Sequence, residues 1–264
     1  MKVVILAGGM QSTLNNENEG IPKPMIDIGG KPLLWHIMKH FSEYGLNEFI
    51  ICGGYRVDMI KEYFMDYYIY ASDITVDLST NTIEVHKKKT ENWKVTVVDT
   101  GLFAATGQRV SLIKKYIDDE NFIVTYGDCL SDIDMQKLIE THDRNGKVAT
   151  IAMAKPSGRN QLLPIDDEGK IRYEQMDTIS EETAWVNADC IVFRRKVFDY
   201  LDGNYDLEKH LFIRLSKEQQ IAPYQHKGYW TTIETRRDLC AAENLWNAEL
   251  APWIKQKVAD RQGM

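Results

Sequence analysis

The 264-residue sequence predicts an α/β fold: a doubly wound, mostly parallel, Rossmann-like sheet with an inserted ribbon and a C-terminal helical extension. Two observations predict this fold. Short runs of β-branched and aliphatic residues alternate with segments whose apolar residues recur at helical spacing, which is typical of a parallel sheet covered by helices. In addition, the first run, residues 3–6, ends in Gly8-Gly9, as a buried strand does where it enters a ligand-binding loop.

The elements of the N-terminal half follow from these patterns in chain order. Apolar residues between positions 31 and 44 have helical spacing, with Pro32 suited to the first turn and Gly45 to the C-terminal cap. Residues 48–52 form a second apolar run, which closes in two glycines. A helix at 59–68 and a short strand at 96–98 complete the series strand, helix, strand, helix, strand.

The second half of the chain is less regular. Residues 122–125 predict a buried strand that runs into Asp128, and residues 135–142 and 148–154 predict a helix and a strand. The stretch 171–193 alternates in polarity and predicts mixed or antiparallel strands added to the sheet. Helical spacing returns at 197–201, 208–215 and 236–260. We therefore expect an α/β domain over residues 1–235 and a helical extension over 236–264.

Residues 67–95 predict an exposed ribbon inserted into the α/β domain. The ribbon carries Asp73, Thr75 and Asp77, and it also carries the basic run His-Lys-Lys-Lys at 86–89. A basic run of this kind is more often a solvated face than a binding site, and the residues themselves leave both interpretations open.

Composition excludes several classes of protein. The net charge of −7 argues against a nucleic-acid or anionic-membrane partner. With 44% hydrophobic and 27% charged residues, the chain is neither disordered nor membrane-spanning. The N-terminus lacks the long apolar segment and cleavage site of a secretory signal. The cysteines are far apart and form no CxxC pair, so we expect structural thiols and a cytoplasmic protein; they are Cys52, Cys129, Cys190 and Cys240.

The loop after the first strand is the first candidate binding element. Residues 6–14 spell LAGGMQSTL, in which glycines allow a close backbone approach and free amides can face phosphate oxygens. The loop matches neither GxGxxG nor GxxxxGK[ST], which argues against a dehydrogenase or a P-loop ATPase. The alternative interpretation is an ordinary glycine-rich turn between a strand and a helix.

A lysine and an aspartate are the next candidates. Lys23 lies between Pro22 and Pro24, which restrict its backbone, so it can present a positive charge to a phosphate; a plain surface lysine is the alternative. Asp128 follows a strand directly, and a carboxylate there suits Mg²⁺ beside substrate phosphates. Asp132, four residues later, is more easily explained as the N-cap of the next helix.

Longer runs across nearly the whole chain carry a family resemblance. They are LAGG (6–9), KPM (23–25), IGGKPLLWHIM (28–38), CGGY (52–55), IKEYF (60–64), VDTG (98–101), TG (106–107), Arg109 and TYGD (125–128). With these runs the chain resembles the sugar-phosphate nucleotidyltransferase family, and within it the glucose-1-phosphate cytidylyltransferases. The resemblance implies a sheet of the nucleotidyltransferase type and a homo-oligomer.

The resemblance also implies the reaction and its residues. The phosphate of a small-molecule acceptor would attack the α-phosphorus of CTP and expel pyrophosphate, with Mg²⁺ as cofactor. Catalysis would involve Lys23 and Arg109, and the metal would be held by Asp128 and Glu234. The nucleotide would be bound by Leu6, Ala7, Gly8, Gly9, Met10, Gln11, Ser12, Thr13, Thr106 and Gly127. Such transfers depend on positioning and charge neutralisation rather than on a covalent nucleophile.

The nucleotide loop departs from the family pattern GGxGTRL. Gln11 and Thr13 stand where that pattern has a glycine and an arginine, so one cation expected against the triphosphate is absent. Arg56, Arg109 or a lysine of the 87–89 run are the candidate replacements for that cation. A catalytically silent, nucleotide-binding subunit is the corresponding alternative function.

The acceptor side departs further. Relatives carry an EKP segment whose lysine binds the sugar phosphate and an asparagine-glycine pair, whereas this chain has Gln175 and Asn187-Ala188 as its acceptor-binding candidates. Glucose 1-phosphate or a related sugar phosphate is one candidate acceptor. A non-sugar phosphate used in capsule modification, for example L-glutamine phosphate, is the other.

Overall fold

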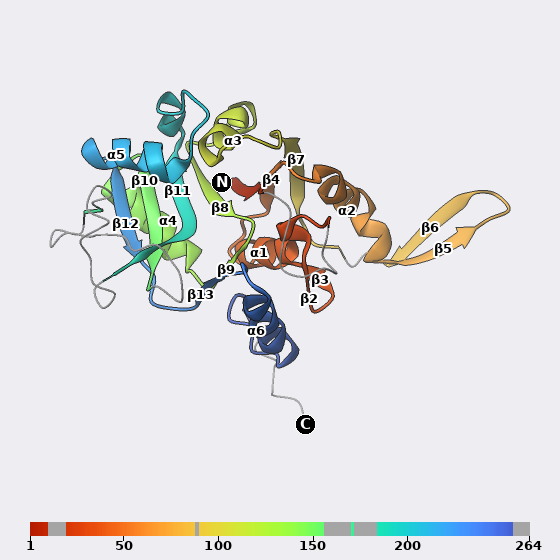
Figure 1. The fold of residues 1–264 in the computed structure, drawn as a ribbon. Helices are drawn as coiled ribbons and strands as arrows, with labels where there is room; N and C mark the ends of the chain where they lie inside the picture. Colours follow the sequence, from red (N-terminus) through yellow and green to blue (C-terminus); the bar gives the residue numbers. More distant parts are fainter. Residues whose placement is uncertain (10–19, 88–89, 156–169, 172–183, 256–264) are drawn as a thin grey trace.

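A seven-stranded sheet runs through the centre of the molecule in the order β12-β10-β11-β8-β1-β4-β7 (Figure 1). The computed structural model describes residues 1–9, 20–87, 90–155, 170–171 and 184–255. In sheet order, its strands are β12 (Ile221–Gln225), β10 (Ala149–Ala154), β11 (Val186–Arg194), β8 (Asn121–Tyr126), β1 (Val3–Ala7), β4 (Glu48–Gly53) and β7 (Lys94–Asp99).

The sheet is mostly parallel, which confirms the predicted fold class. β1 pairs in parallel with β4 and β8, and β7 and β12 pair in parallel with β4 and β10. Only β11 runs antiparallel to its neighbours, β10 and β8, so the antiparallel strand expected within 171–193 is found at Val186–Arg194. All five residues of β1 are buried because helices cover both faces of the sheet.

The helices divide between the two faces, and each face has its own hydrophobic core. One core includes residues of α1, α4 and α6, and the other includes residues of α3 and α5. Alternate residues of β1 enter opposite cores, Val3 and Ile5 on one side and Val4 and Leu6 on the other. The α-helices are α1 (Leu33–Ser42), α2 (Val57–Tyr70), α3 (Thr106–Leu112), α4 (Met135–Asn145), α5 (Ile213–Lys217) and α6 (Arg236–Asn247).

Shorter elements complete the described chain, and several were not predicted. The region expected to be helical at 197–201 is a 3₁₀ turn, Arg195–Asp199, and the region at 208–215 is a π-helix, Leu207–Phe212, followed by α5. Two further 3₁₀ turns are Lys23–Met25 and Lys114–Tyr116. The remaining small strands are β2 (Asp27–Ile28), β3 (Lys31–Pro32), β9 (Cys129–Ser131) and β13 (Trp230–Thr232).

The C-terminal segment packs into the main body. The predicted helix over 236–260 is wrong in its extent: α6 ends at Asn247, and Glu249, two residues later, adopts a left-handed backbone conformation (φ 58°) that cannot continue a helix. Trp253 is fully buried, and its indole Nε1 donates to His36 Nδ1 at 3.2 Å. Leu250, in contrast, is exposed. The described part of the extension is therefore continuous with the core formed by α1.

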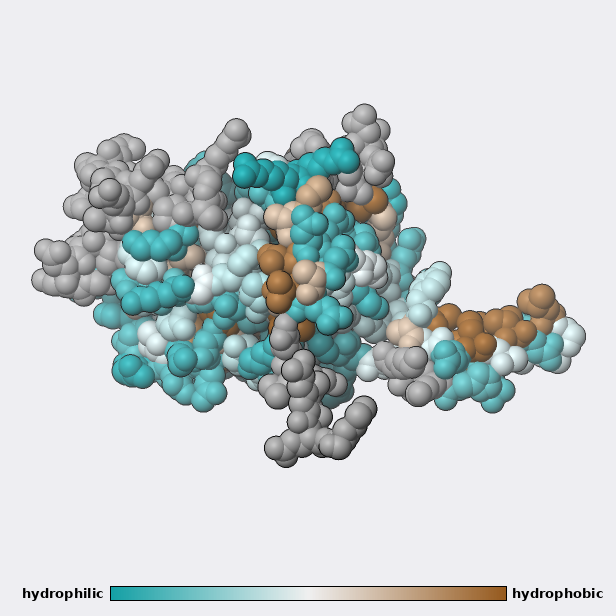
Figure 2. Space-filling model, turned by 90° about the horizontal axis from the view of Figure 1, so that it is seen from below, coloured by the Kyte–Doolittle hydropathy of each residue, from teal (hydrophilic) through white to brown (hydrophobic). Residues whose placement is uncertain are grey.

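The inserted ribbon is an antiparallel hairpin that projects from the body (Figure 1). It comprises β5 (Asp73–Asp77) and β6 (Thr82–Lys87), while the flanks of the predicted insertion belong to α2 and β7. One side of the hairpin is hydrophobic and the other hydrophilic, as Figure 2 shows. Asp73, Thr75 and Asp77 are exposed, and so is His86 at the start of the basic run. Lys88 and Lys89 lie outside the described residues.

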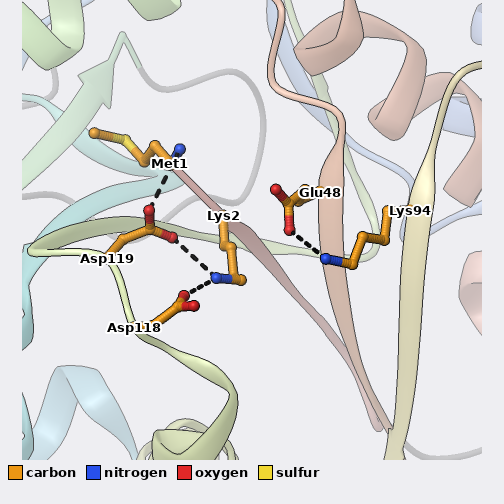
Figure 3. Close-up of polar contacts among 6 residues, drawn as sticks. All are labelled: Met1, Lys2, Glu48, Lys94, Asp118 and Asp119. Carbon is orange, nitrogen blue, oxygen red and sulfur yellow. Dashed lines mark hydrogen bonds and ion pairs between the residues drawn. The ribbon is translucent and has the colours of Figure 1, made fainter.

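Charged pairs gather at the amino end of the parallel strands (Figure 3). Lys2 forms ion pairs with Asp118 and Asp119, and Glu48 on β4 pairs with Lys94 on β7 at 3.1 Å. Ligands of open α/β sheets bind at the carboxyl ends of the strands, so these pairs lie at the edge opposite the expected site.

The sequence predicted neither a membrane-spanning segment nor a disulfide framework. Within the described ranges, every helix falls short of the length and apolarity that crossing a bilayer requires. All four cysteines are free, with Cys52, Cys129 and Cys190 buried and Cys240 exposed.

Candidate active site

A cleft of about 630 Å³ opens where the carboxyl ends of β1 and β8 meet. Nucleotide sites commonly have volumes of this order, roughly 300–1,000 Å³. The cleft brings together predicted residues from distant parts of the chain: Leu6, Ala7, Gly8, Gly9, Lys23, Thr106, Arg109, Gly127, Asp128 and Glu234. Met10, Gln11, Ser12, Thr13 and Gln175 lie outside the described residues. Asn187 is on β11 and does not line the cleft.

Glycines line the cleft because side chains would collide with its walls. A Cβ atom at Gly8 would lie 2.0 Å from Arg109 Nη1, and one at Gly127 would lie 2.9 Å from Pro24 Cγ. At Gly9, no atom of the described residues lies within 4 Å of a Cβ position. The backbone can therefore approach a ligand closely at the end of β1, as the phosphate-loop interpretation requires.

Lys23 and Asp128 face each other across the cleft. Lys23 Nζ lies 2.9 Å from Asp128 Oδ2, although the two residues are 105 positions apart in sequence. Lys23 is held by the 3₁₀ turn that follows Pro22, and Asp128 follows β8 directly. Both side chains retain about a quarter of their exposure, so each can reach a ligand in the cleft. The lysine is thus a cation of the cleft and more than a surface residue.

Arg109 on α3 joins the ends of three strands. Its Nη2 donates to Gly8 O at 2.7 Å, and its Nη1 donates to Thr100 Oγ1 at 2.6 Å and Gly101 O at 2.9 Å. A longer bond from Nη1 reaches Gly53 O at 3.2 Å. The guanidinium is buried and lines the cleft, but these oxygens use its donors. The geometry supports a positioning residue for the glycine loop, and direct contact with the nucleotide stays a prediction.

Arg109→Met is expected to destabilise the protein and to weaken CTP binding. Carbonyl oxygens buried without donors cost about 1–3 kcal/mol each, so the free energy of unfolding should fall by about 2–4 kcal/mol. Urea denaturation and calorimetric titration with CTP measure the two effects. Arg56→Met is the control, because Arg56 pairs with Asp58 outside the cleft. Unchanged stability of Arg109→Met would contradict a bracing function.

Asp128 and Glu234 are brought together by a small two-stranded antiparallel sheet. β13 pairs with β9, and the Ile233 amide donates to Asp128 O at 2.8 Å, which places Glu234 beside the strand-end aspartate. Among the described residues, no group of three or more metal-ligating side chains converges. Two carboxylates nevertheless match Mg²⁺, which takes few protein ligands and completes its shell with phosphate and water.

Asp132 is not the helix cap that we expected. The N-cap of α4 is Asp134, whose side chain accepts a hydrogen bond from the Lys137 amide at 3.1 Å. Asp132 instead lies 2.9 Å from His226 Nε2. Both aspartates precede the same helix, so the local sequence does not show which of them caps it. The contact between Asp132 and His226 in the folded chain distinguishes the two.

Three acidic or phenolic groups lie beneath the cleft floor. The Tyr126 hydroxyl donates to Glu208 Oε1, and burial raises the pKa of both groups. Burial, and then the nearby Asp128, Glu208 and Glu234, raise the pKa of the Asp189 carboxyl well above its usual range. Burial therefore favours the protonated forms of the Asp189 and Glu208 carboxyl groups.

Nearly the whole chain around this cleft matches a known protein family. A family model described as nucleotidyl transferase matches residues 2–248. The chain belongs to the nucleotidyl transferase family. Within that family it is 40% identical over 255 residues to glucose-1-phosphate cytidylyltransferase of Salmonella typhi, covering 96% of this chain and 98% of that protein. It is 38% identical over 258 residues to a probable glucose-1-phosphate cytidylyltransferase of Bacillus subtilis (strain 168), covering 96% of this chain and 99% of that protein.

Solved structures agree with the nucleotidyl transferase fold. HddC from Yersinia pseudotuberculosis superposes with a TM-score of 0.71 at 24% identity, covering 93% of this chain and 99% of that one. A UDP-glucose pyrophosphorylase complexed with UDP-glucose has a TM-score of 0.69 at 15% identity, covering 94% and 98%. These likenesses confirm the predicted fold. The family match and the cytidylyltransferase relatives confirm the resemblance seen in the sequence.

Neither Arg56 nor Arg109 replaces the arginine of the family loop pattern, because both guanidinium groups already have partners. Arg56 Nε pairs with Asp58, and Arg109 is bound to backbone oxygens. Lys87 lies on β6, on the ribbon that projects away from the body (Figure 1). Among the described residues, Lys23 is therefore the cation that lines the cleft without being tied to the backbone.

Several residues of the nucleotidyl transferase cleft were missed by sequence reasoning. The loop after β7 lines the cleft with Leu102, Phe103, Ala104 and Ala105. Tyr126, the last residue of β8, and Asp206, just before the π-helix, line it as well. One signal was available, because β7 ends at the same sheet edge as β1 and β4 and its following loop must lie there. Glu208, which lies outside the cleft lining but accepts a hydrogen bond from Tyr126, had no comparable local signal.

Proposed function

We propose that this chain is a cytidylyltransferase, which converts CTP and a phosphorylated small-molecule acceptor into a CDP-linked product and pyrophosphate. The single observation that carries the proposal is the convergence of Gly8-Gly9, Lys23 and Asp128 on one cleft, in a chain 40% identical to a glucose-1-phosphate cytidylyltransferase. By the same likeness, glucose 1-phosphate or a related sugar phosphate is the first candidate acceptor.

The reaction needs positioned charge rather than a covalent nucleophile. An oxygen of the acceptor phosphate attacks the α-phosphorus of CTP, the bond from that phosphorus to the oxygen bridging to the β-phosphate breaks, and pyrophosphate leaves with the electron pair. The glycine loop at the end of β1 would hold the triphosphate, with Arg109 fixing the loop. Lys23, whose ammonium faces the cleft, would stabilise negative charge that develops on the phosphates.

Mg²⁺ fits the donor set that the cleft presents. Asp128 and Glu234 both line it with carboxylate oxygens, the ligands that hard divalent cations prefer. We propose that these two residues hold Mg²⁺, which when bound supplies charge neutralisation for the triphosphate. Lys23, now paired with Asp128, would then be released to contact phosphate oxygens.

A coupled pyrophosphate-release assay tests the function. The protein is incubated with CTP, MgCl₂ and a panel comprising glucose 1-phosphate, related sugar phosphates, L-glutamine phosphate and other non-sugar phosphates, with UTP and dTTP as alternative nucleotides. Release that requires both CTP and an acceptor supports the cytidylyltransferase. Absence of release with every acceptor, while calorimetry still shows CTP binding, would instead identify a silent nucleotide-binding subunit.

We also propose that the protein is a cytoplasmic homo-oligomer. The free cysteines support a reducing compartment, and the ribbon β5–β6 supports self-association. An isolated two-stranded hairpin is at best marginally stable in water, yet the ribbon exposes apolar side chains on one side (Figure 2), namely Ile74, Val76, Leu78 and Ile83. A second copy can cover that side with its own matching side, as two-fold symmetry allows.

Val76→Asp combined with Ile83→Asp is expected to lower the oligomeric state. The two residues are cross-strand partners on the apolar side, so the double change places charge in the middle of the proposed interface. Sedimentation velocity compares it with Thr75→Asp plus Glu84→Gln, the neighbouring pair on the polar side. An unchanged sedimentation coefficient in the first variant would contradict assembly through the ribbon.

A further inference from the structure

The segment that carries Glu234 links the central sheet to a small second sheet (Figure 1). It leaves β12 at Gln225, forms β13, and reaches Glu234 two residues after β13 ends. β13 pairs with β9, which begins directly after Asp128. The two proposed metal ligands, Asp128 and Glu234, therefore flank one end of this small sheet, and their placement depends on how β13 is aligned on β9.

The small sheet itself is short. Three residue pairs join β13 to β9, and a two-stranded sheet of this size is at best marginally stable on its own. At the end near the cleft, one further contact closes it, in which the Ile233 amide donates to Asp128 O at 2.8 Å. Successive side chains of a strand point to opposite faces, so a one-residue slip of β13 would turn Glu234 away from the cleft.

Asp132 and His226 close the opposite end of the small sheet. The Asp132 amide donates to Tyr229 O at 3.1 Å, just beyond the last strand pair. His226 Nε2 donates to Tyr229 O at 3.1 Å and lies 2.9 Å from Asp132 Oδ1. The main-chain amide of His226 donates to Met153 O on β10 at 2.7 Å. His226 therefore ties the small sheet to the central sheet.

The close approach of Asp132 and His226 requires a glycine at position 228. A Cβ atom on Gly228 would lie 2.3 Å from Asp132 Oδ1 and 2.8 Å from His226 Cε1. His226 is buried, and neither Asp132 nor His226 lines the cleft. The pair is thus placed to hold the backbone of the segment that leads to Glu234, and it is not placed to contact a substrate.

We propose that Asp132 and His226 form a clasp that holds β13 in register on β9. The clasp thereby positions Glu234 beside Asp128, where the two carboxylates would hold Mg²⁺. Asp132 and His226 are positioning residues, which act on the metal through Glu234. The inference rests on the proposed cytidylyltransferase function and its metal site, and it names the residues that set the geometry of that site.

Titration with Mn²⁺, a paramagnetic substitute for Mg²⁺, tests the clasp without turnover. Electron paramagnetic resonance measures the free Mn²⁺, with the protein in excess over a non-hydrolysable CTP analogue. We expect Asp132→Ala and His226→Leu each to weaken Mn²⁺ binding by about tenfold, a usual effect of losing a contact that orients a metal ligand. His226→Gln should bind Mn²⁺ nearly as the wild type does, because its amide nitrogen can replace Nε2 as a donor. Gly228→Ala, whose methyl group would collide with both side chains, should also weaken binding and serves if Asp132→Ala does not fold.

A double-mutant cycle shows whether the clasp acts through Glu234. In a Glu234→Gln background, Asp132→Ala should cause little further loss of Mn²⁺ affinity, because the carboxylate that the clasp positions is already absent. Amide hydrogen exchange at Ile233 should become faster in Asp132→Ala but not in Glu234→Gln, since this amide reports the pairing with Asp128 O. Steady-state kinetics of Asp132→Ala should show a raised half-saturating Mg²⁺ concentration with kcat at saturating Mg²⁺ nearly unchanged.

Asp134→Ala is the matched structural control. Asp134 lies two residues from Asp132 and caps α4, so its loss destabilises that helix and leaves the contact with His226 in place. The Mn²⁺ affinity of this control should equal that of the wild type.

Three results would overturn the inference. They are an unchanged Mn²⁺ affinity in Asp132→Ala, an equal weakening in Asp134→Ala, or losses from Asp132→Ala and Glu234→Gln that add in full. A wild type that binds no Mn²⁺ would instead refute the metal site of the proposed function. Exchange at the Ile233 amide would then still show whether the clasp fixes β13, because that measurement needs no metal.

Discussion

Lys23→Met is expected to lower kcat about a hundredfold to a thousandfold while leaving the protein folded, because removing one preorganised charge from a transfer site has effects of this size. The loss of stability should be small. Both side chains of the Lys23–Asp128 pair line the open cleft, where water can solvate Asp128 once the lysine is removed, so the loss should stay close to the about 0–1 kcal/mol of solvent-exposed ion pairs. The effect on turnover therefore greatly exceeds the effect on folding.

Steady-state kinetics and urea denaturation of the same preparation check this expectation. Lys94→Met is a matched control, since Lys94 pairs with Glu48 at the opposite edge of the sheet (Figure 3). The control should lose no activity. Normal turnover in a folded Lys23→Met variant would show that a different cation acts on the phosphates.

Asp128→Asn is expected to raise the Mg²⁺ concentration for half-maximal rate by about tenfold or more. An amide oxygen keeps the shape of the side chain but removes the charge that a hard divalent cation favours, and losing a charge-assisted contact weakens binding by about that factor. Glu234→Gln should act in the same direction, since Glu234 lines the same cleft.

The measurement is a titration of pyrophosphate release against MgCl₂ at saturating CTP. Asp118→Asn is the matched control, because Asp118 pairs with Lys2 at the amino end of the strands. Should Asp128→Asn show the wild-type dependence on Mg²⁺ while Lys23→Met loses turnover, Asp128 would be a partner that orients the lysine and not a metal ligand.

The order of strands and helices was predictable because it depends on neighbouring residues. The β-branched run at Val3–Ala7 and the apolar spacing within Leu33–Ser42 both reflect one buried face, which a short window of sequence reveals. The rule that ligands lie at the carboxyl ends of parallel strands then placed Gly8 and Asp128 at one edge without any knowledge of contacts. The structure brings both into one cleft.

Predictions failed where a residue's partner is distant in sequence. By local pattern, Asp132 and Asp134 are equally good candidates for the helix cap. Only the contact of Asp132 with His226, nearly a hundred positions away, distinguishes the two residues. The bracing contacts of Arg109 have the same origin, because Gly8 and Gly53 reach it only after the sheet has formed.

The sequence by itself determined the fold class, the family and the residue types that a phosphate-transfer site needs, since each of these is a property of short segments. Tertiary structure alone decided which donors remain free for a substrate. It bound the guanidinium of Arg109 to backbone oxygens and paired Lys23 with Asp128. The physical reason is that charge compensation is settled by proximity in space, and strands that are far apart along the chain create that proximity.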